Sequence, residues 1–269
     1  MSRKLAVIGV GNMANAIVSG ILSSDINLDA IYYFDKNTNQ YSKAPKSDIC
    51  NIADSLTDAV DLADVVLLSV KPQNYPQALE DIKTVNGFEN KLYISIAAGI
   101  TAQSVSDELG GACVIRVLPN LPMTVGMGVS VICKNEKASN DDFGFVCAVF
   151  ESAGSVLVID ESEMNRIIGV TSSSPAYVFK FIDAIYQGAL AQGLDTAGLL
   201  DAICDVFIGS AELLKRSSVS PSELISRVAS KGGTTERALN ELNNGHVDDV
   251  IVQAMIACTN RADELGGNK

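Results

Sequence analysis

The segment that most restricts the fold is Gly9–Ala14, which reads Gly-Val-Gly-Asn-Met-Ala and follows the apolar run Leu5–Val10. It joins this predicted strand to a predicted helix, Asn12–Leu22. Gly9 permits a tight turn, Gly11 lets a ligand approach the backbone, and Ala14 lets the helix pack closely on the strand. The free N–H groups that begin the helix are suited to a pyrophosphate. We therefore expect a dinucleotide here, held by Gly9, Val10, Gly11, Asn12 and Met13.

Short runs rich in β-branched residues alternate with helix-length segments through the first half of the chain. The predicted strands are Leu5–Val10, Ala30–Phe34, Asp64–Val70, Leu92–Ile96, Cys113–Leu118, Gly128–Cys133 and Ser155–Ile159. Such alternation predicts a parallel sheet covered by helices on both faces. No helix fits between the strands around Met123–Gly128, so a hairpin is expected there. Residues 1–160 are thus predicted to form a Rossmann-type, doubly wound α/β domain.

After Asp160 only helical patterns follow. The predicted helices are Ser162–Ile168, Pro175–Gln192, Thr196–Arg216, Pro221–Val228, Thr234–Asn243 and Val247–Leu265. Pro175–Gln192 is apolar nearly all the way round, which is typical of a helix buried on most sides. A domain of about 110 residues barely buries such a helix alone. We therefore expect 161–269 to be an all-α dimerisation domain, the alternative being a central helix in a monomeric bundle.

The end of the second predicted strand carries opposing signals about the cofactor. Asp35 is placed to accept hydrogen bonds from the adenosine ribose hydroxyls, which favours NADH. Lys36, with Asn37 and Lys43, could instead hold a 2′-phosphate, which favours NADPH. Both signals are present, so either dinucleotide is compatible with the sequence.

Two further loops leave the carboxyl ends of predicted strands, where open α/β sheets bind their ligands. They are Ser69-Val70-Lys71-Pro72 and Ala97-Ala98-Gly99-Ile100. The small residues of the second loop would let a nicotinamide ring lie close to the backbone. Either loop could equally be an ordinary connection.

A glycine-rich loop, Ser230-Lys231-Gly232-Gly233-Thr234-Thr235, lies between two predicted helices. Paired glycines expose consecutive N–H groups, and the two threonine hydroxyls stand at the start of the next helix. Free amides, a favourable dipole end and hydroxyl donors suit a carboxylate. The alternative is a purely structural helix–loop–helix connection.

Composition excludes several classes of function. The net charge is −12 and the sequence pI about 4.5, so a nucleic-acid partner is not expected. The six cysteines form no Cys-x-x-Cys pair and there is one histidine, which favours a reducing compartment and no metal site. No apolar stretch is long enough to span a bilayer. The sequence predicts a cytoplasmic protein without membrane contact.

The residues that are missing indicate the type of reaction. Dehydrogenases of hydroxy acids commonly use a histidine or lysine to move the alcohol proton. The one histidine, His246, lies in a turn, and Gly169 is followed four residues later by Ser173 rather than by lysine. Reduction of a C=N bond fits better, because a protonated imine carries its own proton.

Together these segments resemble the pyrroline-5-carboxylate reductase family over nearly the full chain. The matching segments are Gly9–Ala14, Ser69–Pro72, Ser95–Ile100, Arg116–Pro122, Ser173–Phe179 and Lys231–Thr235. The family usually has threonine at Leu121, glycine at Ser174, often proline at Lys231, and asparagine-arginine or serine at Asp35-Lys36. The last difference leaves open whether this chain shares the family's frequent preference for NADPH.

The resemblance implies hydride transfer from NADPH or NADH to 1-pyrroline-5-carboxylate, giving L-proline. It places the substrate carboxylate on Gly232 and Gly233 and the hydroxyls around Ser230 and Thr234, with Asn120 also binding substrate. It implies that Thr235 orients or protonates the ring nitrogen. It further implies interlocked homodimers, which can assemble into larger rings.

Two other functions are compatible with the motifs. One is a different imine or β-hydroxyacid reductase of the same architecture, which the missing lysine disfavours. The other is a dinucleotide-binding regulatory or scaffolding protein without catalysis. Turnover of a substrate panel distinguishes all three.

Overall fold

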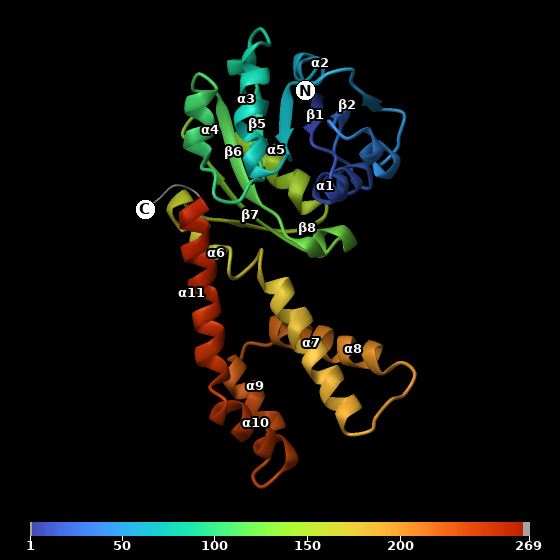
Figure 1. Ribbon diagram of the computed structural model, residues 1–269, viewed down its shortest axis with the longest axis vertical. Coiled ribbons are helices and arrows are strands. Elements are labelled where there is room, and N and C mark those ends of the chain that lie inside the picture. Colours follow the sequence, from blue (N-terminus) through green and yellow to red (C-terminus); the bar gives the residue numbers. More distant parts are fainter. Residues whose placement is uncertain (1, 266–269) are drawn as a thin grey trace. The chain divides into compact units, whose positions relative to one another are not determined.

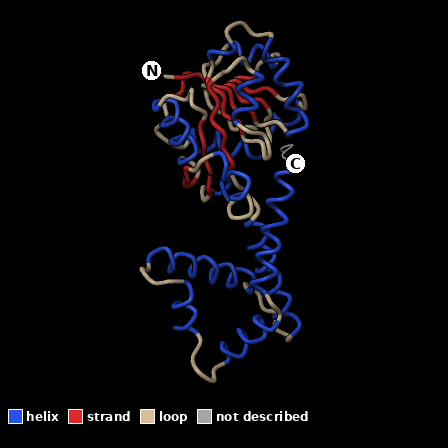
Figure 2. The backbone as a smooth tube through the Cα atoms, turned by 90° about the vertical axis from the view of Figure 1, so that its left-hand side faces the viewer, coloured by secondary structure: helices blue, strands red, loops and turns tan. Residues whose placement is uncertain are grey.

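The computed structural model describes residues 2–265, so the last four residues of the predicted helical domain lie outside the described range. The chain divides into two compact units. We call the described residues 2–175 and 257–265 the sheet unit, and residues 176–256 the helical unit. In Figure 2 the strands all belong to the sheet unit, and the helical unit consists of helices and their connecting loops.

The sheet unit is built on one eight-stranded sheet, in the order β3-β2-β1-β4-β5-β6-β7-β8 (Figure 1). The strands are β1 (Arg3–Ile8), β2 (Leu28–Phe34), β3 (Cys50–Ile52), β4 (Val65–Leu68), β5 (Leu92–Ser95), β6 (Cys113–Leu118), β7 (Gly128–Lys134) and β8 (Gly154–Val158). All neighbours pair in parallel except β6 and β7. These two are antiparallel because only a short turn, Leu121–Val125, joins them. The predicted parallel sheet and hairpin are both confirmed.

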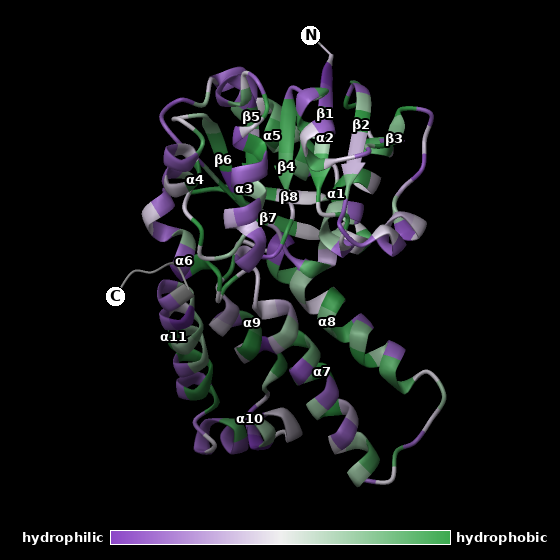
Figure 3. Ribbon diagram, turned by 45° about the horizontal axis from the view of Figure 1, so that its top comes forward, coloured by the Kyte–Doolittle hydropathy of each residue, from purple (hydrophilic) through white to green (hydrophobic). Residues whose placement is uncertain are grey.

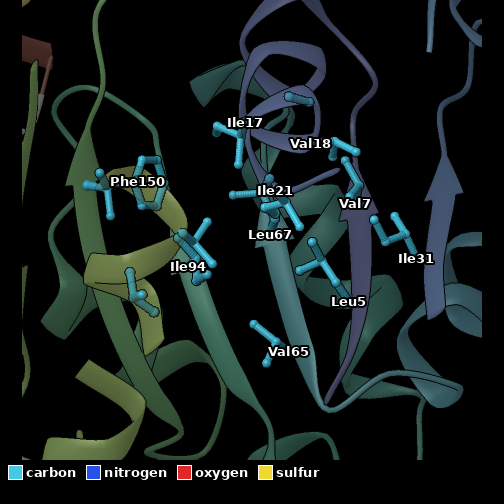
Figure 4. Packing of buried hydrophobic residues seen from close by; sticks show 14 of the residues in the cluster. Leu5, Val7, Ile17, Val18, Ile21, Ile31, Val65, Leu67, Ile94 and Phe150 are labelled. Carbon is cyan, nitrogen blue, oxygen red and sulfur yellow. The ribbon is translucent and has the colours of Figure 1, made fainter. Parts of the chain in front are cut away.

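Helices cover both faces of the sheet. They are α1 (Asn12–Leu22), α2 (Leu56–Asp61), α3 (Tyr75–Lys83), α4 (Ala102–Glu108), α5 (Asn140–Glu151) and the short α6 (Met164–Ile167). Successive residues of a strand point to opposite faces, so Leu5 and Val7 join the apolar cluster that includes residues of α1 and α5 (Figure 4). Ala6 and Ile8 join a second cluster with residues of α2, α3 and α4. The sheet is therefore buried on both sides, as a doubly wound fold requires.

The sequence patterns do not predict β3. It pairs with β2 in the register Ile31↔Cys50, and Asn51 and Ile52 are exposed. A three-residue edge strand with two exposed side chains has no alternation that a sequence pattern can reveal. The predicted ends of β1 and β4 are also two residues too long, because the apolar Val10 and Val70 lie in the turns after the strands.

The helical unit contains α8 (Leu199–Arg216), α9 (Pro221–Val228) and α10 (Thr234–Asn244), together with most of α7 (Ser174–Ala191) and the first half of α11 (Val247–Leu265). The chain enters this unit through α7 and leaves it through α11. All five helices were expected from the sequence, although α8 begins three residues later than predicted. None of the described helices combines the length and apolar character needed to cross a membrane.

The compact units divide at 175/176, fifteen residues after the predicted domain boundary at 160/161. Met164 and Ile168 pack with Ala262 of α11 on side chains of β6 and β7. The buried Arg116 on β6 reaches Glu161 at 3.4 Å and Asn165 at 3.2 Å. The sequence pattern therefore changes from strands to helices at Asp160, before the chain leaves the sheet unit after residue 175.

Within a single chain, the helical unit has almost no buried apolar core. Among residues 176–256, all of which the structure describes, Ile203 is the one buried side chain. Figure 3 shows hydrophobic residues spread along α7 and α8, and α7 has no buried residue. The burial expected of this helix does not occur within one chain, and α7 is not the centre of a monomeric bundle.

Candidate functional site

Three of the loops identified in the sequence meet at one cavity in the sheet unit. The cavity measures about 420 Å³ and lies at the carboxyl ends of β1, β2 and β4. The expected cofactor-binding residues that line it are Gly9, Gly11, Asp35, Lys36, Ser69, Val70 and Lys71. The remaining lining residues include Gln40, Gln73 and Asn74, which no motif singled out. Their only sequence signal is that they follow Asp35 and Lys71 closely in polar loops.

The glycine turn has the geometry that a phosphate site needs. Gly9 has φ +94°, and a Cβ there would lie 2.8 Å from the Ser69 carbonyl oxygen. At Gly11 an added Cβ would meet nothing within 4 Å, so the space above the start of α1 is open. Gly11 is also the N-cap of α1 and makes no side-chain capping bond. The turn therefore offers helix N–H groups beside an open space, which fits a dinucleotide pyrophosphate.

The carboxylate of Asp35 is held from both sides by backbone amides. Its Oδ2 accepts from the Val10 N–H at 2.7 Å, and its Oδ1 accepts from the Asn37 N–H at 2.8 Å. The Asp35 backbone is fixed as well, because the Tyr41 hydroxyl accepts from its N–H and donates to its carbonyl oxygen. The glycine turn and the end of β2 thus form one rigid element around this carboxylate.

The end of β4 is tied to its neighbours by buried hydrogen bonds. Ser69 N–H donates to the Ile8 carbonyl at 2.9 Å. The buried Tyr75 hydroxyl donates to the Leu68 carbonyl at 2.9 Å and lies 3.0 Å from Ser95 Oγ. Burial raises the pKa of Tyr75 to about 12, so the phenol keeps its proton. Tyr75 therefore supports the loop that carries Ser69, Val70, Lys71 and Pro72, a role that no sequence motif indicated.

The second loop, Ala97–Gly99, lies between β5 and α4 and does not line the cavity around Asp35. Ala97 and Gly99 are buried, while Ala98 is exposed. The N–H of Ala102, just beyond the loop, donates to the Glu161 carboxylate at 2.6 Å. Of the other expected cofactor residues, Asn12 lines a separate hollow and Pro72 another. Their proposed contacts with a dinucleotide stay predictions.

Asn120 has a structural role that the sequence did not reveal. It is 6% exposed, and its Nδ2 donates to the Thr171 carbonyl at 3.0 Å. Its Oδ1 accepts from the Val129 N–H at 2.8 Å. The amide therefore fastens the turn before β7 to the segment after α6, and any substrate contact would add to these bonds.

The glycine-rich loop in the helical unit closes on itself. Gly233 N–H donates to the Ser230 carbonyl at 2.9 Å, and Gly232 N–H donates to the Glu236 carboxylate at 2.7 Å. The expectation of two free glycine amides is therefore wrong for this conformation, because a tight turn with Gly232 at φ +74° pairs them internally. Glu236 nevertheless demonstrates that the Gly232 amide can hold a carboxylate. Thr235 is half-buried at the start of α10.

Family models match both halves of the chain. One described as pyrroline-5-carboxylate reductase dimerisation matches residues 161–265. Another, described as NADP oxidoreductase coenzyme F420-dependent, matches residues 4–99. The first supports a homodimer formed through the helical half, and the second supports an NAD(P)-dependent oxidoreductase.

Relatives match over nearly the whole chain. A pyrroline-5-carboxylate reductase of Vibrio alginolyticus is 34% identical over 269 residues, covering 98% of this chain and 97% of the relative. One from Corynebacterium melassecola is 32% identical over 266 residues, covering 97% and 98%. The crystal structure of Plasmodium falciparum pyrroline carboxylate reductase with NADP bound has a TM-score of 0.86 at 24% identity, covering 98% of each chain. That likeness confirms the fold, and the full-length sequence matches establish the family. The chain belongs to the pyrroline-5-carboxylate reductase family.

Proposed function

We propose that this protein reduces the C=N bond of 1-pyrroline-5-carboxylate to give L-proline, with NADPH or NADH as the reductant. The observation that carries this proposal is the match, end to end, to curated pyrroline-5-carboxylate reductases at 30% identity or more. The dinucleotide cavity in the sheet unit supports it, because hydride transfer requires such a site.

The sheet unit is proposed to bind the cofactor, which supplies the hydride when bound. Gly9, Val10, Gly11, Asn12 and Met13 would hold the pyrophosphate, with Asp35 and Lys36 at the adenosine ribose. The Ser69–Pro72 loop would cover the dinucleotide. Ala97, Ala98 and Gly99 would let the nicotinamide ring lie against the backbone. The open space at Gly11 and the uncapped start of α1 support this assignment.

The helical unit is proposed to bind the substrate carboxylate through the loop Ser230–Thr235. The Gly232 and Gly233 amides and the hydroxyls of Ser230 and Thr234 are the donors in that loop. The carboxylate of Glu236 already accepts from one of these amides, so the substrate would replace an anion of the same kind. Thr235 would hydrogen-bond the ring nitrogen and orient it for hydride addition. Asn120 is proposed as a further substrate-binding residue.

A homodimer with interlocked helical domains is the proposed assembly, with larger rings as its further form. The exposed apolar faces of α7 and α8 support it. We also propose a cytoplasmic location and no nucleic-acid partner. The six free cysteines and the net charge of −12 support these two statements.

The test is steady-state oxidation of NADPH and NADH by the purified protein with 1-pyrroline-5-carboxylate, with proline identified as the product. Turnover with at least one dinucleotide is expected. Turnover of a β-hydroxyacid but not of the pyrroline would favour the related dehydrogenases. Dinucleotide binding without turnover of either substrate would favour a non-catalytic protein.

A further inference from the structure

We propose that Asp35 makes this chain select NADH over NADPH. The inference rests on the proposed function only in assuming that the cavity at the glycine turn holds a nicotinamide dinucleotide. In a sheet of this strand order, the residue that ends β2 faces the adenosine ribose when the pyrophosphate lies on the glycine turn. Asp35 follows β2 directly and lines the same cavity as Gly9 and Gly11.

The carboxylate of Asp35 is fixed in a form that suits hydroxyl donors. Each of its oxygens accepts one backbone N–H, from Val10 at 2.7 Å and from Asn37 at 2.8 Å. A carboxylate has about four acceptor positions, so each oxygen keeps one for the 2′- or 3′-hydroxyl of a ribose. A 2′-phosphate has no hydroxyl at that position and brings a charge of about −1.5 to −2 at neutral pH. It would therefore replace the 2′-hydroxyl contact with repulsion, whereas the 3′-hydroxyl is present in both dinucleotides.

The carboxylate cannot easily move away from a 2′-phosphate. Its two amide partners belong to the glycine turn and to the loop after β2, so a rotation of the side chain would leave Val10 N–H without its acceptor. Val10 is fully buried, and an unpaired buried amide is costly. The selection against the phosphate is thus built into the turn that binds the pyrophosphate.

In the structure, Lys36, Asn37 and Lys43 are poorly suited to bind a 2′-phosphate, although the sequence allowed that role. Lys43 lines a different hollow, together with Asn12 and Asn15. The Asn37 side-chain oxygen accepts from the Asn39 N–H at 3.2 Å and caps the following turn. Lys36 lines the cavity but is exposed, so solvent screens its attraction for a phosphate. The fixed carboxylate outweighs this solvent-exposed cation.

The experiment measures dinucleotide affinity without substrate, by titrating the full-length protein with NADH and with NADPH and following nicotinamide fluorescence. We expect the Kd for NADH to be about tenfold or more below that for NADPH, as for the loss of one hydrogen bond to a charged group. Equal affinities, or tighter binding of NADPH, would overturn the inference. Absence of binding by both dinucleotides would overturn it too, together with the proposed cofactor site.

Two variants assign the effect to this carboxylate. Asp35→Ser removes it and is expected to lower the ratio of NADPH to NADH Kd by about tenfold. Asp48→Asn is the matched control, because Asp48 is an exposed aspartate that does not line the cavity. It removes one negative charge and should leave the ratio unchanged. An equal change in both variants would show a general charge effect and contradict the role of Asp35.

Binding and turnover separate the two proposals. A tenfold preference for NADH in binding without reduction of the pyrroline would support Asp35 selection and reject the proposed reaction. Reduction of the pyrroline with NADPH as the better-bound cofactor would do the opposite. If Asp35→Ser lowers the melting temperature, the wild-type ratio of Kd values still decides the question.

Discussion

The two units of this chain differ in how much of their apolar surface they bury. In the sheet unit, strands and helices enclose a large apolar cluster on each face of the sheet, one of which is drawn in Figure 4. In the helical unit, residues 176–256 bury only Ile203, while side chains such as Phe179, Ile185 and Ile208 are half exposed. Both units are rich in apolar residues, but only one of them can cover those residues within a single chain.

The difference shows that the helical unit is built for a second copy. Burying apolar surface stabilises a protein by about 25 cal/mol per Å², and the five helices of one chain bury almost none of theirs. The match to a dimerisation model over residues 161–265 identifies the partner as another copy of this chain. The sheet unit has its own core and carries the cavity proposed to bind the cofactor.

The largest expected effect comes from a charge on the exposed face of α7. Ile185→Asp would place two carboxylates at a symmetric interface, at a cost of several kcal/mol per copy. We expect monomers by sedimentation and loss of turnover. Ile52→Asp is the control, because Ile52 is also exposed but lies on β3 of the sheet unit. A dimer that survives Ile185→Asp as well as it survives Ile52→Asp would contradict the role given to α7.

A core substitution in the sheet unit should act within one chain. Leu67 on β4 is 1% exposed, so Leu67→Ala is expected to lower the free energy of unfolding by about 2–5 kcal/mol. Leu62→Ala is the matched control, because Leu62 is 46% exposed and its truncation should cost less than about 0.5 kcal/mol. Urea unfolding measures both. Similar losses in the two variants would show that the buried cluster does not dominate the stability of this unit.

Removal of the Thr235 hydroxyl should separate the tasks of the two units. Thr235→Val is expected to lower kcat by about 10- to 100-fold, the effect of one lost hydrogen bond in the transition state. The Kd for the dinucleotide should not change, because the cofactor residues lie in the sheet unit. Thr196→Val, an exposed threonine of the helical unit, should leave both quantities unchanged. Unaltered kcat in Thr235→Val would remove this hydroxyl from the reaction.

The smallest effect is expected at Tyr75, and it depends on pH. Tyr75→Phe removes one of the two donors to the Leu68 carbonyl, which keeps its bond from the Ile96 N–H, at a cost of about 1 kcal/mol. Burial raises the pKa of Tyr75 from 10.0 to about 12, so the folded state holds the phenolic proton more tightly than the unfolded state. This stabilisation is complete below pH 10 and is lost as the pH rises toward 12. The difference in unfolding free energy between wild type and variant should shrink over that range, and a constant difference would contradict the cause given for the shift.

Much of the fold could be predicted because its signals are local. The Gly9–Ala14 turn, the helix Asn12–Leu22 and the antiparallel strand pair follow from residues adjacent in the chain. The edge strand Cys50–Ile52 could not be predicted, because its pairing with β2 depends on tertiary contacts rather than on its own pattern. The packing of α6 on the sheet was missed for the same reason, since its partner Ala262 is about a hundred residues away in the sequence.

The candidate site, like the fold, could be predicted only in part. The sequence by itself determined which residue types are present: the glycine turn, an acid after the second strand, and a Gly-Gly-Thr-Thr loop. Only the tertiary structure decided what they do with their hydrogen bonds. It joined Asp35 to Val10, placed Lys43 in a different hollow, and paired the amides of Gly232 and Gly233 internally. Hydrogen bonds depend on distance and direction in space, and a sequence order specifies neither.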